Sequence, residues 1–132
     1  MIIEYGAFRL SLAGDASPRE WEWWLKSQPS LVRRVQIHKA SHHGSRDGDT
    51  SAAISRLSPE TVIVSVGANN GYGHPAAEAL ALYRNATVYL TALHGTIVVG
   101  ASQSGCYTVR TGQGEAPRPP PASTALPASG TR

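Results

Sequence analysis

Two adjacent histidines, His42 and His43, stand in a Ser-His-His-Gly-Ser loop that follows a β-type run over residues 35–39. Binding and catalytic side chains concentrate in such loops, because the strand fixes the loop while the loop leaves its side chains reachable. Consecutive side chains of an extended segment point to opposite sides, so the two imidazoles are not expected to hold one metal ion equally. One is expected to be a metal ligand, and the other to lie behind it or to contact a substrate phosphate.

The residues around the histidine pair could bind a phosphate-containing substrate. Gly44 permits a tight turn and close backbone approach, because it lacks a Cβ atom. Ser45 then offers a hydroxyl, and Arg46 offers a forked cation that matches phosphate oxygens. Lys39 adds a positive charge just before the loop. Taken by itself, this stretch is explained equally well as a solvated surface loop without chemistry.

Two further polar loops, Gly14-Asp15 and Tyr72-Gly73-His74-Pro75, also follow expected strands. If these strands run side by side in one direction, all three loops open at the same edge of the sheet, where α/β proteins place their sites. A carboxylate and imidazoles meeting there suit zinc or manganese. Considered singly, Asp15 could be a charge at a helix start, and His74 could be a turn residue before a helix.

Apolar alternation and β-branched runs predict strands over residues 1–5, 7–13, 31–39, 61–66, 87–91, 96–99 and 105–110. Helical spacing and capping residues predict helices over residues 18–27, 50–57 and 75–83. In the first helix Ser17 is the expected N-cap, with Glu20 three residues later. Trp21 and Trp24 are spaced for core packing. Strands alternating with helices favour an α/β layered domain.

A chain of 132 residues with 41% hydrophobic and 16% charged residues is typical of one globular domain. The net charge of +3 suits a phosphate-rich partner. Cys106 is the only cysteine, so any metal site must be built from His and Asp. No transmembrane or signal segment is expected, which predicts a cytoplasmic chain. Residues 111–132 are rich in Pro, Ala and Ser and are expected to form a disordered tail after a domain over residues 1–110.

In this order and spacing the three loops closely resemble the C-terminal half of a metallo-β-lactamase-fold hydrolase of the ComEC competence-protein type. The matching segments are Phe8-Arg9-Leu10-Ser11-Leu12-Ala13-Gly14-Asp15, Lys39-Ala40-Ser41-His42-His43-Gly44-Ser45-Arg46, Val64-Ser65-Val66-Gly67-Ala68-Asn69-Asn70-Gly71-Tyr72-Gly73-His74-Pro75 and, later, Val88-Tyr89-Leu90-Thr91 with His94-Gly95-Thr96-Ile97. The resemblance implies half of an αββα sandwich, with one mixed sheet and flanking helices. It also implies a phosphodiester substrate, with DNA processing during uptake as the usual role.

The resemblance assigns a role to each matching residue. Asp15 is similar to a carboxylate that bridges two zinc or manganese ions, and one of His42 and His43 is similar to the last metal ligand. Of the two, His42 is slightly favoured as the ligand, which leaves His43 as a catalytic residue with His74, the histidine that faces the substrate. The candidate substrate contacts are Lys39, Ser45, Arg46 and Tyr72.

The chain departs from the family pattern in lacking the His-x-His-x-Asp-His cluster that supplies most metal ligands in the N-terminal half. Activity is therefore expected to need a complementary N-terminal half or self-association, and the chain would be membrane-associated if it belongs to a ComEC-like assembly. The alternative is a non-catalytic remnant or a nucleic-acid-binding module. Its basic residues would then contact DNA phosphates through Arg33, Arg34, Lys39 and Arg46.

Overall fold

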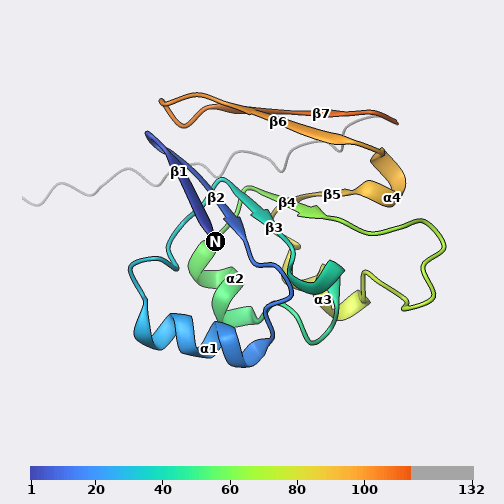
Figure 1. The fold of residues 1–132 in the computed structure, drawn as a ribbon, viewed down its shortest axis with the longest axis horizontal. Helices are drawn as coiled ribbons and strands as arrows, with labels where there is room; N and C mark the ends of the chain where they lie inside the picture. Colours follow the sequence, from blue (N-terminus) through green and yellow to red (C-terminus); the bar gives the residue numbers. More distant parts are fainter. Residues whose placement is uncertain (114–132) are drawn as a thin grey trace, which may run out of the picture.

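The computed structural model describes residues 1–113, which form a mixed five-stranded sheet with helices on one face (Figure 1). The strands are β1 (Ile2–Tyr5), β2 (Phe8–Leu12), β3 (Ile37–Lys39), β4 (Thr61–Val64) and β5 (Thr87–Leu90), and they lie in the order β1-β2-β3-β4-β5. β1 is antiparallel to β2, and the other neighbours are parallel. The expected α/β fold with one mixed sheet is confirmed.

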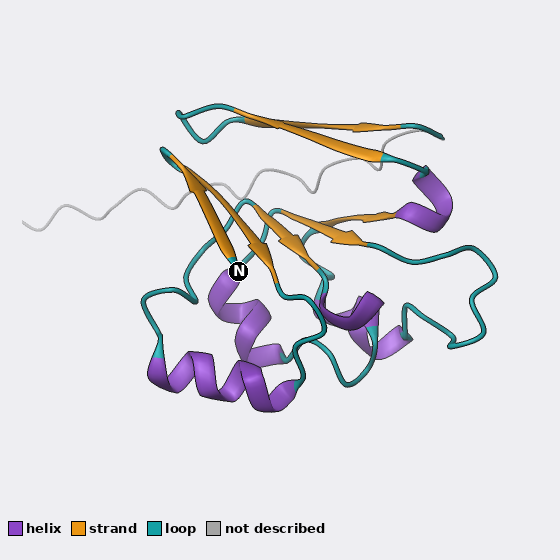
Figure 2. Ribbon diagram, viewed as in Figure 1, coloured by secondary structure: helices purple, strands orange, loops and turns teal. Residues whose placement is uncertain are grey.

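The helices α1 (Pro18–Ser27), α2 (Ser51–Leu57) and α3 (Ala77–Leu82) cover one face of this sheet, whereas the short α4 (Thr91–His94) follows β5. A two-stranded hairpin of β6 (Ile97–Ala101) and β7 (Tyr107–Thr111) lies across the opposite face (Figure 2). The Tyr107 hydroxyl holds the hairpin to the sheet through a 2.8 Å hydrogen bond with Thr61 Oγ1. The described residues thus form three layers, which are the helices, the five-stranded sheet and the hairpin.

The capping residues expected before α1 form a capping box, in which Ser17 and Glu20 satisfy each other's backbone amides. α1 packs through Trp21, which is 3% exposed and lies in a core cluster with Val35 and Leu57. Trp24 meets Trp21 edge to face, with ring centroids 5.1 Å apart. The tryptophans are therefore packing residues, as the spacing predicts.

The strand expected over residues 31–39 is wrong in its first part, because β3 begins only at Ile37. The buried Arg9 guanidinium donates hydrogen bonds to three backbone carbonyl oxygens of this segment. The donor–acceptor distances are 3.2 Å to Leu31, 3.0 Å to Arg33 and 2.8 Å to Arg34. A backbone that curls around one cation cannot continue a strand ladder. Tertiary contact thus overrides the local β preference.

The helix expected over residues 75–83 is also shorter than predicted, since α3 spans Ala77–Leu82. Ala76 is extended, and its amide donates to the carbonyl of Gly44 at 2.8 Å. This hydrogen bond ties the start of α3 to the histidine loop. Residues 114–132, which hold most of the expected disordered tail, lie outside the described residues.

β4 is buried on the helix side, where Val62 and Val64 are fully inaccessible to solvent. The side chains on the other face are less well covered, and Leu10, Leu12 and Ile63 remain half-buried beneath the hairpin layer. No helix within residues 1–113 is long and apolar enough to cross a bilayer. The large apolar residues that are exposed are Met1, Ile3, Tyr5, Trp23, Leu31, Tyr72, Leu80, Leu93 and Val98.

We expect the purified chain to self-associate unless a complementary partner is present, because this much exposed apolar surface promotes association. Sedimentation velocity over a range of concentrations should show species larger than the 14.0 kDa monomer. A sharp monomer boundary together with cooperative thermal unfolding would contradict the expectation.

Candidate functional site

The three polar loops lie together at the carboxyl edge of the sheet, because β2, β3 and β4 are parallel neighbours. Backbone hydrogen bonds join the loops to one another. The amide of His42 donates to the carbonyl of Gly14 at 2.9 Å, and the amide of Ala76 donates to the carbonyl of Gly44 at 2.8 Å. The common edge inferred from the sequence is therefore present, and it brings Asp15 and all three expected histidines into one region.

The histidine loop is a tight left-handed turn over Ser41–Gly44, not the extended segment assumed from the sequence. His42 has φ 45° and His43 has φ 57°, and Gly44 follows with φ 78°. A residue with a Cβ atom is disfavoured in this region by about 1–2 kcal/mol. A Cβ atom added to Gly44 would also lie 2.7 Å from Cβ of Pro75. Backbone strain of this kind is characteristic of functional sites.

His43 is the histidine that faces Asp15. Its Nε2 atom lies 4.0 Å from Oδ1 of Asp15, and its Nδ1 atom lies 2.7 Å from the carbonyl oxygen of Ser65. A carbonyl only accepts hydrogen bonds, so Nδ1 donates to Ser65, and Nε2 is the ring nitrogen that faces Asp15. A metal-binding histidine is typically oriented in this way by its second ring nitrogen.

His42 faces His74 instead, with ring centroids 6.0 Å apart. Asn70 fixes the backbone of His74 on both sides, accepting from its amide at 3.0 Å and donating to its carbonyl at 2.7 Å. The exposed Tyr72 ring stacks on the His74 ring at 6.0 Å. An open hollow of about 470 Å³ is lined by His43, Ser65, Val66, Gly67, Asn70, Tyr72, His74 and Thr91. The imidazoles therefore lie beside a space that could admit a substrate.

The residues expected to contact the substrate differ in how exposed they are. Ser45 is buried, and its hydroxyl accepts from the amide of Asp47 at 3.2 Å, so it stabilises the turn. Arg46 is exposed and lies 4.0 Å from Glu78. Lys39 is half-buried, and burial lowers its pKa, although the nearby carboxylates of Asp15 and Asp49 oppose this shift. Tyr72, at 85% exposure, is the most accessible of the set.

The basic residues considered for nucleic-acid binding lie at opposite ends of β3. Arg33 and Arg34 precede β3, whereas Lys39 and Arg46 come at and after its end. The first two are also paired with carboxylates, Arg33 with Glu4 at 2.9 Å and Arg34 with Glu60 at 3.1 Å.

A buried polar network behind the histidine loop was not foreseen from the sequence. Nδ1 of His38 lies 2.7 Å from the Ser11 hydroxyl, and Nε2 lies 2.9 Å from Oδ2 of Asp49. The same carboxylate oxygen accepts from the amide of Ser41 at 3.0 Å and from the hydroxyl of Tyr83 at 2.6 Å. All five residues are buried. The Ser41 bond holds the first residue of the histidine turn in place.

The electrostatics of this network favour an ionised Asp49. Burial alone would raise the pKa of Asp49, but the hydrogen bond and charge of His38, followed by the Tyr83 hydroxyl and the Ser41 amide, hold it below its ordinary value. Burial, together with the Asp49 carboxylate, raises the pKa of Tyr83, which therefore stays protonated and donates. The only sequence signal for the network was a histidine at a core-facing position of a buried strand.

The residues present fit part of a metal site. Two ligands of one tetrahedral zinc ion, each at about 2.1 Å from the ion, lie about 3.4 Å apart. The 4.0 Å between His43 Nε2 and Asp15 Oδ1 would allow a shared ion after a small side-chain movement. Nδ1 of His74 is buried without a hydrogen-bond partner in the described structure, so it also has an unused polar atom. No group of three or more His, Cys, Asp or Glu side chains suited to hold a metal is assembled within residues 1–113.

Comparison with known proteins gives one informative relative. No protein-family profile matches the chain. ComE operon protein 3 (ComEC) of Bacillus subtilis (strain 168) is 30% identical over 97 residues. The alignment covers 72% of this chain but only 12% of that protein. The chain is therefore distantly similar to a short stretch of a much longer protein.

Proposed function

We propose that this chain is the C-terminal half of a metallo-β-lactamase-like hydrolase of the ComEC type, which acts on phosphodiester bonds such as those of DNA. The observation that carries the proposal is the facing pair of Asp15 and His43 at the carboxyl edge of the parallel strands. The distant similarity to ComE operon protein 3 gives independent support. The second half of the αββα sandwich, with the remaining metal ligands, would come from another segment or chain.

The arrangement of layers supports this division of the fold. Within residues 1–113 the sheet has helices on one face, whereas its other face carries only the two-stranded hairpin. A second sheet beside this hairpin would cover the half-buried Leu10, Leu12 and Ile63 and complete the sandwich. The complementary half is thus expected to cover the exposed apolar surface and to supply the remaining metal ligands.

Asp15 and His43 are the residues that would hold zinc or manganese, and the geometry favours His43 over His42, the histidine preferred from the sequence. His43 has its Nδ1 atom fixed by Ser65 and turns Nε2 toward Asp15, whereas His42 faces His74. A bound metal pair would lower the pKa of a water molecule and neutralise charge on the scissile phosphate.

His42 and His74 are left for proton transfer. His42 is exposed and His74 lines the open hollow, and a positioned imidazole is a common general acid that can protonate a leaving oxygen. The accessible Tyr72 ring, stacked on His74, could contact a base or sugar next to the scissile bond. Arg46 and Lys39 provide the positive charge at this edge.

Metal binding tests the proposal. We expect weak, exchangeable binding of zinc or manganese to the isolated chain, because two ligands do not make a tight closed centre. Titration calorimetry should show that Asp15→Ala and His43→Ala abolish it, while His42→Ala retains most of it. His94→Ala is the matched control, since His94 binds the backbone of Leu90 instead. Stoichiometric metal that survives dialysis against a chelator would contradict the two-ligand account, as would binding unchanged in Asp15→Ala.

A further inference from the structure

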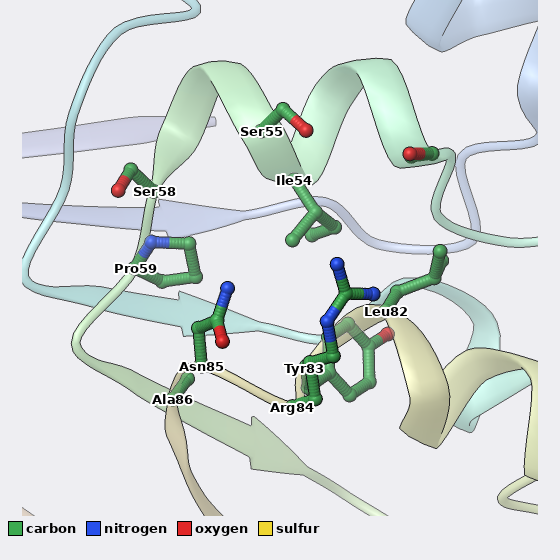
Figure 3. A pocket seen from close by; sticks show the side chains of 10 residues that line it. Ile54, Ser55, Ser58, Pro59, Leu82, Tyr83, Arg84, Asn85 and Ala86 are labelled. Carbon is green, nitrogen blue, oxygen red and sulfur yellow. The ribbon is translucent and has the colours of Figure 1, made fainter. Parts of the chain in front are cut away.

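A second pocket lies at the opposite edge of the sheet from the candidate site. It opens where Pro59 precedes β4 and where Asn85 and Ala86 precede β5, and α2 forms its other wall (Figure 3). Its volume is about 320 Å³, which is at the small end of the range for ligand-binding pockets. Its lining residues are Ser51, Ile54, Ser55, Ser58, Pro59, Leu82, Tyr83, Arg84, Asn85 and Ala86.

Arg84 supplies an uncompensated positive charge in this pocket. Its side chain extends from the loop between α3 and β5 toward Ile54 and Leu82 (Figure 3). None of the residues that line the pocket is acidic, and within residues 1–113 the guanidinium has no hydrogen-bond or ion-pair partner. Arg33 and Arg34, by contrast, are each paired with a glutamate. A free guanidinium fork in a polar pocket is well suited to oxygens of a phosphate.

The other lining residues provide both polar groups and apolar side chains. Asn85 extends beside Arg84 in Figure 3, whereas Ser55 of α2 and Ser58, the C-cap of α2, line the wall without pointing toward Arg84. Ile54, Pro59 and Leu82 provide apolar surface next to these donors. The Tyr83 ring is a rigid part of the wall, because its hydroxyl is held by Asp49. The Tyr83 wall is therefore fixed, while Arg84 and Asn85 are exposed at the pocket mouth. The pocket suits a ligand with an anionic head and an apolar body.

We propose that this pocket binds a small organic phosphate of nucleoside monophosphate size. The phosphate would accept from the Arg84 guanidinium and the Asn85 amide, and the nucleoside would pack on Ile54, Pro59 and Leu82. Phosphate fits better than carboxylate here, because it presents three acceptor oxygens, two of which can pair with the guanidinium fork while the third accepts from the Asn85 amide. The site is separate from the metal-binding edge, so it does not depend on the hydrolase proposal.

The test is titration calorimetry of the full chain with dAMP, deoxyadenosine and inorganic phosphate, in a chelator to exclude metal binding. We expect dAMP to bind about tenfold or more tightly than either fragment, because both parts of the pocket are then used. Arg84→Gln should weaken dAMP binding by about tenfold or more, since it removes a charge-assisted hydrogen bond from an accessible side chain. Arg110→Gln, an exposed arginine on β7 outside the pocket, should leave it unchanged.

A short oligodeoxynucleotide distinguishes a free nucleotide from a DNA strand. If (dA)₄ binds more tightly than dAMP and Arg84→Gln weakens both to the same extent, the pocket binds a phosphate of a DNA strand. The proposed site would then stand, with DNA as its ligand. Three results would overturn the proposal. These are no dAMP binding at millimolar concentration, equal affinity for dAMP and deoxyadenosine, and an Arg84→Gln variant that binds dAMP as the unchanged chain does.

Discussion

Asp49→Ala is expected to lower the free energy of unfolding by about 3–5 kcal/mol, which is a large part of the stability of a domain of this size. The substitution removes the common acceptor for His38, Ser41 and Tyr83, and all three donors would remain buried without a partner. An unsatisfied buried donor costs its full desolvation penalty, whereas the original hydrogen bond contributed less. We therefore expect a much larger loss than for a typical polar substitution.

Urea denaturation of Asp49→Ala, Asp49→Asn, Asp47→Ala and the unchanged chain measures this effect. Asp49→Asn should cost less than Asp49→Ala, because its amide oxygen can still accept one of the hydrogen bonds. Asp47→Ala is the matched control, since Asp47 is exposed and only its backbone amide is engaged. A loss below about 1 kcal/mol in Asp49→Ala would show that the network does not contribute as described.

The stability contribution of Asp49 is expected to depend on pH in a defined direction. Its folded-state pKa lies below the ordinary value of 3.8, so its stabilising effect is fully present above about pH 4 and is lost as the pH falls through the folded-state value. The stability difference between the unchanged chain and Asp49→Asn should therefore shrink on acidification below about pH 4. Denaturation curves between pH 7 and pH 3 test this, and a difference that grows at low pH would contradict it.

The edge of the sheet that carries the site was predictable from the sequence, because each polar loop directly follows an apolar or β-branched run. The left-handed turn at His42 and His43 was not, since hydrogen bonds to Gly14 and Ser65 from elsewhere in the chain determine it. The choice between the two histidines depends on that turn. For this reason the sequence alone did not show which histidine faces Asp15.

Two other features, the late start of β3 and the Asp49 network, could not be predicted from the sequence, because long-range contacts determine them. The residues before Ile37 have a β-type pattern, but Arg9 captures their carbonyl groups. The Asp49 network joins residues up to 72 positions apart, from Ser11 to Tyr83, and no local pattern signals it. Local propensities therefore indicate the strands and loops, whereas long-range polar contacts set the geometry of the site.

Phosphodiester hydrolysis is expected to require both halves of the sandwich. One metal ion in a two-metal site activates the nucleophile and the other stabilises the leaving oxygen, so half a ligand set should lose nearly all of the rate. Groups that act as a unit are strongly non-additive, and a loss of about a thousandfold or more is expected for the chain alone. Restoring the missing ligands should recover activity that depends on Asp15 and His43.

The decisive measurement is manganese- or zinc-dependent cleavage of single-stranded DNA and bis-p-nitrophenyl phosphate, by the chain alone and after addition of the N-terminal half of a related protein. We expect no turnover above background for the chain alone. In the mixture we expect metal-dependent turnover that Asp15→Ala and His43→Ala abolish while Asp47→Ala does not. Metal-dependent turnover by the chain alone that is lost in Asp15→Ala would contradict the account, and so would an inactive mixture in which the two halves bind each other.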